Sequence, residues 1–415
     1  MPRLHSTPGS RAFSIGWIGV LAMLGAAMVT AEIISGSMMP LMADGLNTSE
    51  GMIGQAVTAS AIVAIFASLS LGKLCGDHDR RLILIVMSLF LVASNLGVAL
   101  SPNVWLMLAS RLLLGAAIGI IWGLMPAVVL RLAPEGEFPR SFATVVLGVA
   151  AAGVIAAPSA AYLGDLFSWR AVYLGATLLA VLATTMLVLW FPSLPAKPGA
   201  LNRDLRGTLN LPGLMAGMVG VMLMFGGMQA FFGYLVPFLE SVTRLEPAGV
   251  SLTLLLYGVL GTAGNLVAPR SLKKSIRWTL VIASATMSAL LLILLLTGSF
   301  FLPTVLALMV WAFSRSHVGV GANSWLAHTF PDHLEGAGGI LVAVIQGSMM
   351  IGAILGGVLI DTVGARAPAA ASAVILGIAA VHIIYAMKPK ISRDVADRAR
   401  APVVDKVVPI SEEPI

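Results

Sequence analysis

Charge is scarce in this sequence. Aspartate, glutamate, lysine and arginine together make up 11% of its 415 residues, whereas a soluble domain carries about a quarter. Hydrophobic residues make up 58%, and the mean hydropathy is +0.95. The charged side chains are too few to cover a water-exposed surface. The composition therefore excludes a soluble globular domain.

Cysteine and cofactor motifs are also scarce. The single cysteine, Cys75, excludes an internal disulfide and a cysteine metal cluster. The histidines have no metal-ligand spacing, and no P-loop is present to bind ATP. We therefore expect no cofactor and no metal. The formal net charge of +6 follows the topology described below, so it does not indicate a nucleic-acid partner.

Long apolar segments alternate with short polar loops along the chain. A bilayer core of about 30 Å needs about 20 apolar residues per helix. Twelve segments are long enough, at 14–40, 52–74, 82–100, 103–130, 140–163, 171–191, 211–239, 249–269, 277–297, 300–326, 336–360 and 368–387. The sequence therefore predicts an all-α integral membrane protein with twelve transmembrane helices.

Basic residues define the orientation of these helices. Of the 25 lysines and arginines, 20 fall on the side of the two termini and three on the other side. The remaining two, Arg111 and Arg315, lie within spans. Because loops rich in lysine and arginine stay in the cytoplasm, both termini are expected to be cytoplasmic.

The chain also divides into two related halves. The polar stretch 192–210 predicts a cytoplasmic linker between bundles of six helices at 1–191 and 211–387, followed by a cytoplasmic tail at 388–415. Three pairs repeat at an interval of 196 residues, namely Arg81 and Arg277, Asp165 and Asp361, and Arg170 and Arg366. Parallel repeats of six helices are typical of secondary transporters with the major facilitator fold.

Four stretches resemble a known family. They are TSEGMIGQAVTASAIVAIFASL (48–69), RLLLGAAIGIIWGLMPAVVLRLAP (111–134), LPGLMAGMVGVMLMFGGMQAFFGYLVPFL (211–239) and AGGILVAVIQ (337–346) through GGVLIDTVG (356–364). They are similar to the major facilitator superfamily, in the twelve-span drug:proton antiporter branch, and look most like bacterial purine ribonucleoside efflux pumps.

That resemblance implies a function. It implies an antiporter, not an enzyme, that exports a small molecule across the inner membrane, needs no cofactor beyond the proton gradient and acts as a monomer. The alternatives are a multidrug or sugar exporter of the same family and, more remotely, a membrane sensor or enzyme.

The resemblance assigns gating and helix-packing roles to residues that match the family's motifs. After the second span the chain reads GKLCGDHDRR (72–81), in which Gly72, Arg80 and Arg81 fit the family's loop motif. Gly76 stands where the family has aspartate, and Asp77 is the expected substitute. The remaining fits to the family's helix motifs are Arg111, Gly115 and Gly119 in the fourth span and Gly153 and Pro158 in the fifth.

Charged groups inside the membrane are the candidates for proton coupling. Burying one costs from about 2.5 kcal/mol upward, so each needs a pairing group or a wet cavity. Glu32 and Arg111 both fall about 12 Å below the outer surface, counting ~1.5 Å per residue. Glu32 is the expected proton carrier, with Arg111 as its pairing group. A permanent Glu32–Arg111 ion pair that only fixes packing is an alternative, and His317 is an alternative carrier.

Substrate binding needs amides or charges for polar groups and a flat apolar wall for stacking. The resemblance places the first and fourth helix of each half around the cavity. The candidate substrate-binding residues are Trp122, Gln229, Phe232, Arg315, Asn323 and Gln346. Phe231 and Phe232 are adjacent, so at most one is expected to face the cavity. Arg315 and His317 stand where hydrophobic residues are expected, and they favour a more polar or anionic substrate.

Overall fold

Apolar segments separated by polar loops form helices throughout the described part of the chain. The computed structural model describes residues 8–196 and 205–387. Within these residues all regular secondary structure is helical, and twelve helices are long and apolar enough to cross a membrane. The predicted linker 192–210 lies partly outside the described residues, and the predicted tail 388–415 lies wholly outside them.

The first half contains eight helices: α1 (Pro8–Ser37), α2 (Met39–Gly45), α3 (Glu50–Leu69), α4 (Leu71–Cys75), α5 (Arg80–Ala99), α6 (Val104–Leu132), α7 (Phe138–Leu166) and α8 (Trp169–Trp190). The second half contains eight more: α9 (Leu205–Leu209), α10 (Leu214–Phe232), α11 (Leu235–Ser241), α12 (Pro247–Lys274), α13 (Ile276–Thr297), α14 (Phe301–Thr329), α15 (Leu334–Thr362) and α16 (Ala367–Ala386). The short helix α9 lies in the predicted linker and was not expected.

Three predicted spans are interrupted. The segment 14–40 ends at Ser37, and α2 begins at Met39 with a proline in its first turn. The segment 52–74 breaks at Ser70 into α3 and α4, and 211–239 breaks at Gly233 into α10 and α11. A proline lacks the N–H that would continue the helix, which accounts for the first break. Hydropathy does not detect such breaks, because they leave the apolar composition of the segment unchanged.

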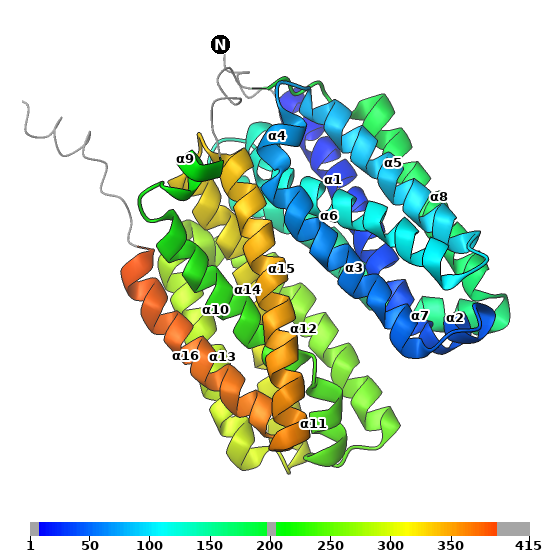
Figure 1. Cartoon of the computed structure of the whole chain (residues 1–415). Helices are drawn as coiled ribbons and strands as arrows, with labels where there is room; N and C mark the ends of the chain where they lie inside the picture. The colour runs from blue at the N-terminus through cyan, green and yellow to red at the C-terminus, as the bar shows by residue number, and fades with distance from the viewer. Residues whose placement is uncertain (1–7, 197–204, 388–415) are drawn as a thin grey trace, which may run out of the picture.

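The two halves form six-helix bundles with the same packing (Figure 1). In the first half α1 packs on α7, α3 on α6 and α5 on α8. In the second, α10 packs on α15, α12 on α14 and α13 on α16. The repeat extends to single bonds, because Arg81 donates to the carbonyl of Val188 and Arg277 donates to that of Ile384. Both members of the second pair lie 196 residues after those of the first.

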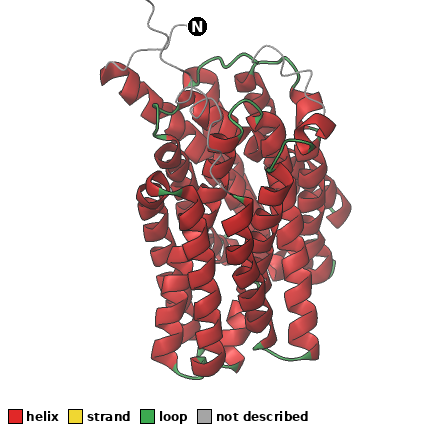
Figure 2. Cartoon of the chain, turned by 90° about the vertical axis from the view of Figure 1, so that its left-hand side faces the viewer, coloured by secondary structure: helices red, strands yellow, loops and turns green. Residues whose placement is uncertain are grey.

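The bundles have two ends, between which the helices run side by side (Figure 2). We call the end that carries α4 and α9 the terminus-side face, and the end that carries α2 and α11 the opposite face. The ribbons of the two bundles meet near the terminus-side face and diverge toward the opposite face (Figure 1). The inter-bundle contacts involve α15 with α3, α4 and α6, α12 with α7, and α14 with α6 and α7.

Backbone packs directly on backbone where the bundles meet. A Cβ added at Gly338 would lie 2.2 Å from the carbonyl oxygen of Gly123, and one added at Gly339 would lie 2.2 Å from that of Ser68. Neither glycine can therefore carry a side chain in this arrangement. We call these contacts of α15 with α3 and α6 the seam. The bundles are closed together at the terminus-side face.

Candidate transport pathway and gate

The Arg315 side chain lies in an aromatic cluster where α10, α12 and α14 approach one another. Its guanidinium carbon is 4.7 Å from the centroid of the Phe232 ring. Phe232 stacks on Tyr257 with 5.5 Å between ring centroids, and Tyr257 in turn lies 6.0 Å from Trp311. Phe231 is buried in contact with Trp311 and Phe238.

Arg315 has no ion pair with any described residue. Its guanidinium neighbours the hydroxyl of Tyr257, but that hydroxyl has no hydrogen bond of ordinary geometry among the described residues. The Nε atom of Arg315 is likewise buried without a hydrogen-bond acceptor there. The cluster therefore offers a cation, a hydroxyl and an aromatic face to a ligand.

Glu32 and Arg111 lie near each other without forming an ion pair. Arg111 is fully buried, and its Nη2 atom donates to the hydroxyl of Ser35 at 2.7 Å and to that of Tyr173. Its Nε and Nη1 atoms have no acceptor among the described residues. Glu32 is half-buried, and Arg111 is its charged neighbour. The permanent ion pair considered as an alternative is not present in this conformation.

His317 is buried and bonded to its own helix. Its Nδ1 atom lies 2.9 Å from the carbonyl oxygen of Phe313, and the two rings have centroids 5.1 Å apart. This geometry makes Nδ1 the protonated nitrogen, because a carbonyl oxygen can only accept. His317 is therefore held in place by α14, one turn from the point where Phe313 packs.

The predicted amides are distributed along different helices. Asn323 donates to the carbonyl of Gly319 at 2.9 Å, so part of its amide is used within α14. Gln229 and Gln346 are half-buried, on α10 and α15. Trp122 on α6 is half-buried and packs against the apolar core. Of the predicted substrate-binding residues, Phe232 and Arg315 are the pair in direct contact.

Arg80 links the two bundles at the terminus-side face. Its Nε atom donates to Oε1 of Glu335 at 2.8 Å, and its Nη2 atom donates to Oε2. Its Nη1 atom donates to the carbonyls of Cys75, Gly76 and His78. One buried arginine thus holds its own loop and the beginning of α15. A cavity of about 190 Å³ lies beside this pair and is lined in part by Gly72.

Two acidic residues that were not predicted from the sequence form the ion pair and the helix cap of this region. Glu335 opens α15, and its pairing with Arg80 spans 255 positions, which no local pattern indicates. Asp79 caps α5 and accepts hydrogen bonds from the backbone N–H groups of Arg81 and Leu194, each at 2.8 Å, and from the Ser193 hydroxyl. Asp77, the expected substitute, is exposed. The preference of aspartate for the N-cap position of a helix is the sequence signal that could have indicated Asp79.

Electrostatics at this face follow from burial and hydrogen bonding. Burial raises the pKa of the Cys75 thiol to about 12, with Arg80 opposing the shift. Burial also raises the pKa of Asp79, but its three hydrogen bonds outweigh that effect and leave the pKa below its ordinary value. At neutral pH Cys75 is therefore a thiol and Asp79 a carboxylate.

The glycines of the helix motifs differ in their surroundings. A Cβ added at Gly115 would lie 2.4 Å from the carbonyl oxygen of Ser60, and one at Gly119 would lie 2.4 Å from that of Ala64. These two glycines therefore let α6 approach α3 closely. Gly153 is less restricted, since its added Cβ would meet Ile33 at 3.6 Å. Pro158 belongs to α7, and its side chain lies outside those described.

Comparison with known proteins identifies the family to which this architecture belongs. The family model of the Major Facilitator Superfamily matches residues 20–314 and 217–412. The chain belongs to the major facilitator superfamily. It is a multi-pass membrane transporter rather than an enzyme.

Relatives of known name cover most of the chain. The transcription regulatory protein OpdE of Pseudomonas aeruginosa is 36% identical over 380 residues, which are 90% of this chain and 94% of OpdE. The purine ribonucleoside efflux pump NepI of Salmonella enteritidis is 33% identical over 367 residues, which are 88% of this chain and 92% of NepI.

Solved transporters share the fold at low sequence identity. The proton:xylose symporter XylE has a TM-score of 0.74 and 15% identity, covering 90% of this chain and 96% of XylE. The transporter FucP in its outward conformation has a TM-score of 0.75 and 13% identity, covering 90% of this chain and 99% of FucP. These similarities show the fold of two six-helix bundles.

Proposed function

We propose that this transporter exports purine ribonucleosides and their analogues in exchange for protons. The substrate rests on the 33% identity with proteins named purine ribonucleoside efflux pump. Coupling to protons rests on Glu32, a carboxyl group near the charged Arg111 but not paired with it. Export follows the named function of those relatives.

Arg111 can couple the protonation of Glu32 to a conformational change. When Glu32 loses its proton to water, the new carboxylate attracts the guanidinium, whose Nε and Nη1 atoms have no acceptor among the described residues. Arg111 then moves from Ser35 and Tyr173 toward Glu32, which shifts α6 relative to α1 and α8. Protonation of Glu32 reverses the movement.

The Arg315 cluster is the proposed substrate site. A purine is flat and presents the ring acceptors that arginine binds in a fork geometry. The Phe232 and Tyr257 rings supply an aromatic surface for stacking. Gln229, Asn323, Gln346 and Trp122 are proposed to complete the site when the bundles rearrange.

The proposed setting is the bacterial inner membrane, with both termini cytoplasmic and a monomeric chain. In that orientation the terminus-side face is the cytoplasmic face, so the structure corresponds to an outward-facing transporter. The bundles 1–191 and 211–387 are the proposed moving bodies, and 192–210 is the linker between them.

Proton flux into liposomes that contain the purified protein tests the proposal. Inosine, guanosine, arabinose or chloramphenicol is added across a pH gradient. We expect inosine- and guanosine-driven proton flux in the wild type, a flux at least tenfold lower in Glu32→Gln, and normal flux in Glu246→Gln, an exposed control. Flux with only the drug or the sugar refutes the nucleoside assignment. Flux that survives in Glu32→Gln moves the proton site to His317.

A second candidate function comes from the relative named a transcription regulatory protein, which is 36% identical. In this alternative the chain binds its ligand and changes conformation as a sensor, without net transport. The liposome experiment separates the two, because a sensor binds nucleoside but produces no proton or nucleoside flux.

A further inference from the structure

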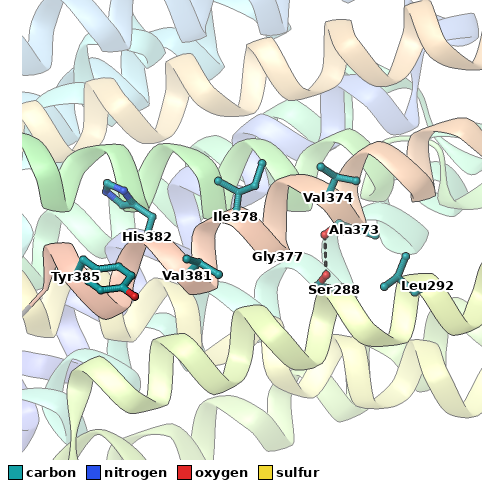
Figure 3. A pocket seen from close by; sticks show the side chains of 9 residues that line it. All are labelled: Ser288, Leu292, Ala373, Val374, Gly377, Ile378, Val381, His382 and Tyr385. Atoms are coloured by element: carbon teal, nitrogen blue, oxygen red, sulfur yellow. Dashed lines mark hydrogen bonds between the residues drawn. The ribbon is translucent and has the colours of Figure 1, made fainter.

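A groove runs along the outer surface of the second bundle between α13 and α16 (Figure 3). Its volume is about 610 Å³, within the range of small-molecule sites. Ser288, Ala373 and Gly377 line its floor. Val374 and Val381 at its rim are 60% and 58% exposed, so the groove opens toward the lipid side of the bundle.

The groove lies in one leaflet. It extends from Ala373 to Tyr385 on α16, a distance of about 18 Å at the helical rise. Ser288 is near the middle of α13, and Tyr385 is at the terminus-side end of α16. Half of a hydrocarbon core is about 15 Å thick, so the groove spans the leaflet nearest the terminus-side face.

The middle of the groove is mostly apolar, and two of its polar groups are bonded within the bundle. The hydroxyl of Ser288 donates to the carbonyl of Ala373 at 2.6 Å, as the dashed line in Figure 3 marks. The Nε2 atom of His382 donates to the carbonyl of Ala216 at 2.8 Å. With these two groups bonded, the middle of the groove matches an apolar chain in both chemistry and length, and the Tyr385 hydroxyl lies at its terminus-side end.

A cation lies at the terminus-side end of the groove. Arg277, near the beginning of α13, donates from Nη2 to the carbonyl of Ile384, the residue before Tyr385. This is its single hydrogen bond to described residues, and it forms no ion pair with them. Trp278 and Tyr385 beside it are 51% and 68% exposed, and such aromatic side chains favour the headgroup level of a membrane.

We propose that this groove binds one anionic phospholipid, with an acyl chain along Gly377 and Ala373 and its phosphate at Arg277. The first bundle provides a comparison inside the same molecule. Arg81 donates to Val188 in the same way, but Val181 and Thr177 stand at the positions related by the repeat to Gly377 and Ala373. Valine and threonine are larger than glycine and alanine, so we assign the site to the second bundle.

Native mass spectrometry of the delipidated protein tests the site. Phosphatidylglycerol or phosphatidylcholine with the same acyl chains is added to the wild type, Arg277→Gln, Gly377→Val and the matched control Arg81→Gln. We expect the wild type and Arg81→Gln to bind one phosphatidylglycerol about tenfold more tightly than phosphatidylcholine. Arg277→Gln loses this preference, and Gly377→Val loses tight binding of both lipids.

The two arginine variants distinguish a lipid site at Arg277 from general attraction of anionic lipid to a positive face. Loss of the preference in both variants would indicate general attraction and would overturn the proposal, as would equal binding of the two lipids by the wild type. Competition by inorganic phosphate would indicate an anion site without an acyl chain, which also contradicts it. Gly377→Val leaves the Arg277 hydrogen bond in place, so it tests the groove even if Arg277→Gln fails to fold.

Discussion

Three buried or half-buried arginines differ in how far their donors are satisfied. Arg80 uses Nε, Nη1 and Nη2 in hydrogen bonds, whereas Arg111 uses Nη2 alone. Arg315 contacts an aromatic face and has no ion pair among the described residues. An unsatisfied cation in the membrane is costly. An arginine with fewer acceptors in the protein is therefore more able to bind a group that moves, such as a ligand or a newly formed carboxylate. We therefore propose a structural role for Arg80, an exchange of acceptors for Arg111 and ligand binding for Arg315.

Arg315→Gln is expected to weaken nucleoside binding 10- to 100-fold, because the fork of donors is lost. Phe232→Leu should have a smaller effect. The double variant should show a coupling of about 1 kcal/mol, as expected of a cation held over a ring. Calorimetric titration with inosine measures all three, with Arg366→Gln as an exposed control on the opposite face. Additive effects would mean that Phe232 and Arg315 act on the substrate separately.

Asp79→Ala is expected to destabilise the protein by about 1 kcal/mol at pH 7, the usual cost of losing an N-cap. The folded pKa lies below the ordinary value of 3.8, so the stabilisation is complete well above pH 3.8 and is lost as the pH falls through the lowered folded value. Unfolding in detergent between pH 7 and pH 3 should therefore show the difference from wild type shrinking with acid. Asp79→Asn, which can still cap the helix, should lie between the two.

At the scale of elements, the twelve spans were predictable because each is a long apolar run, and the structure confirms their number. The breaks at Met38, Ser70 and Gly233 were not predictable from hydropathy, since the residues around them stay apolar. The short helix α9 depends on a tertiary contact, in which Thr208 is buried against α15 beside Gly336. Local propensity does not encode such contacts.

Two ion pairs among the described residues join the bundles, and one of them, Arg80–Glu335, links the beginning of α5 to the beginning of α15. Arg80 is nearly inaccessible and Glu335 is 24% exposed, whereas the second link, Lys273–Glu137, is 47% and 30% exposed. Removing one member of a buried pair costs about 3–5 kcal/mol, and exposed pairs contribute about 0–1 kcal/mol. The first pair therefore stabilises the closed terminus-side face far more than the second.

Glu335→Gln is expected to open the terminus-side face and expose Cys75. Burial raises the pKa of this thiol to about 12, so the closed protein reacts slowly with maleimide near neutral pH. We expect labelling to become at least tenfold faster in Glu335→Gln and to change less than twofold in Lys273→Gln. Equal rates in the two variants would show that the buried pair does not control the closure.

At the scale of the whole molecule, two bundles of the same packing make backbone-to-backbone contact at the terminus-side face. The repeat of 196 residues was visible in the sequence, and the bonds Arg81–Val188 and Arg277–Ile384 extend it to main-chain contacts. Single candidates such as Phe232 and Arg315 could be proposed from residue type, but their contact required the three-dimensional packing of α10 on α14. Glu335 was not predicted, because a glutamate at this position indicates no role until the fold places α15 beside Arg80.

Gly339→Val is expected to prevent the bundles from closing while leaving each bundle folded. The added side chain would collide with the carbonyl of Ser68, which is backbone and cannot move aside. Export in liposomes should fall more than tenfold, and Cys75 should label as fast as in Glu335→Gln. Gly347→Val on the same helix, where an added Cβ meets nothing within 4 Å, should leave the labelling rate unchanged.

The seam of glycines also bears on the insulation of the membrane. Contacts made by backbone alone have no rotamers to exchange and leave no space for a file of water molecules, along which protons would pass. A seam built from flexible side chains would let the proton gradient discharge through the resting protein. We therefore expect the close contacts of Gly123, Gly338 and Gly339 to make the closed state an electrical barrier as well as a mechanical one.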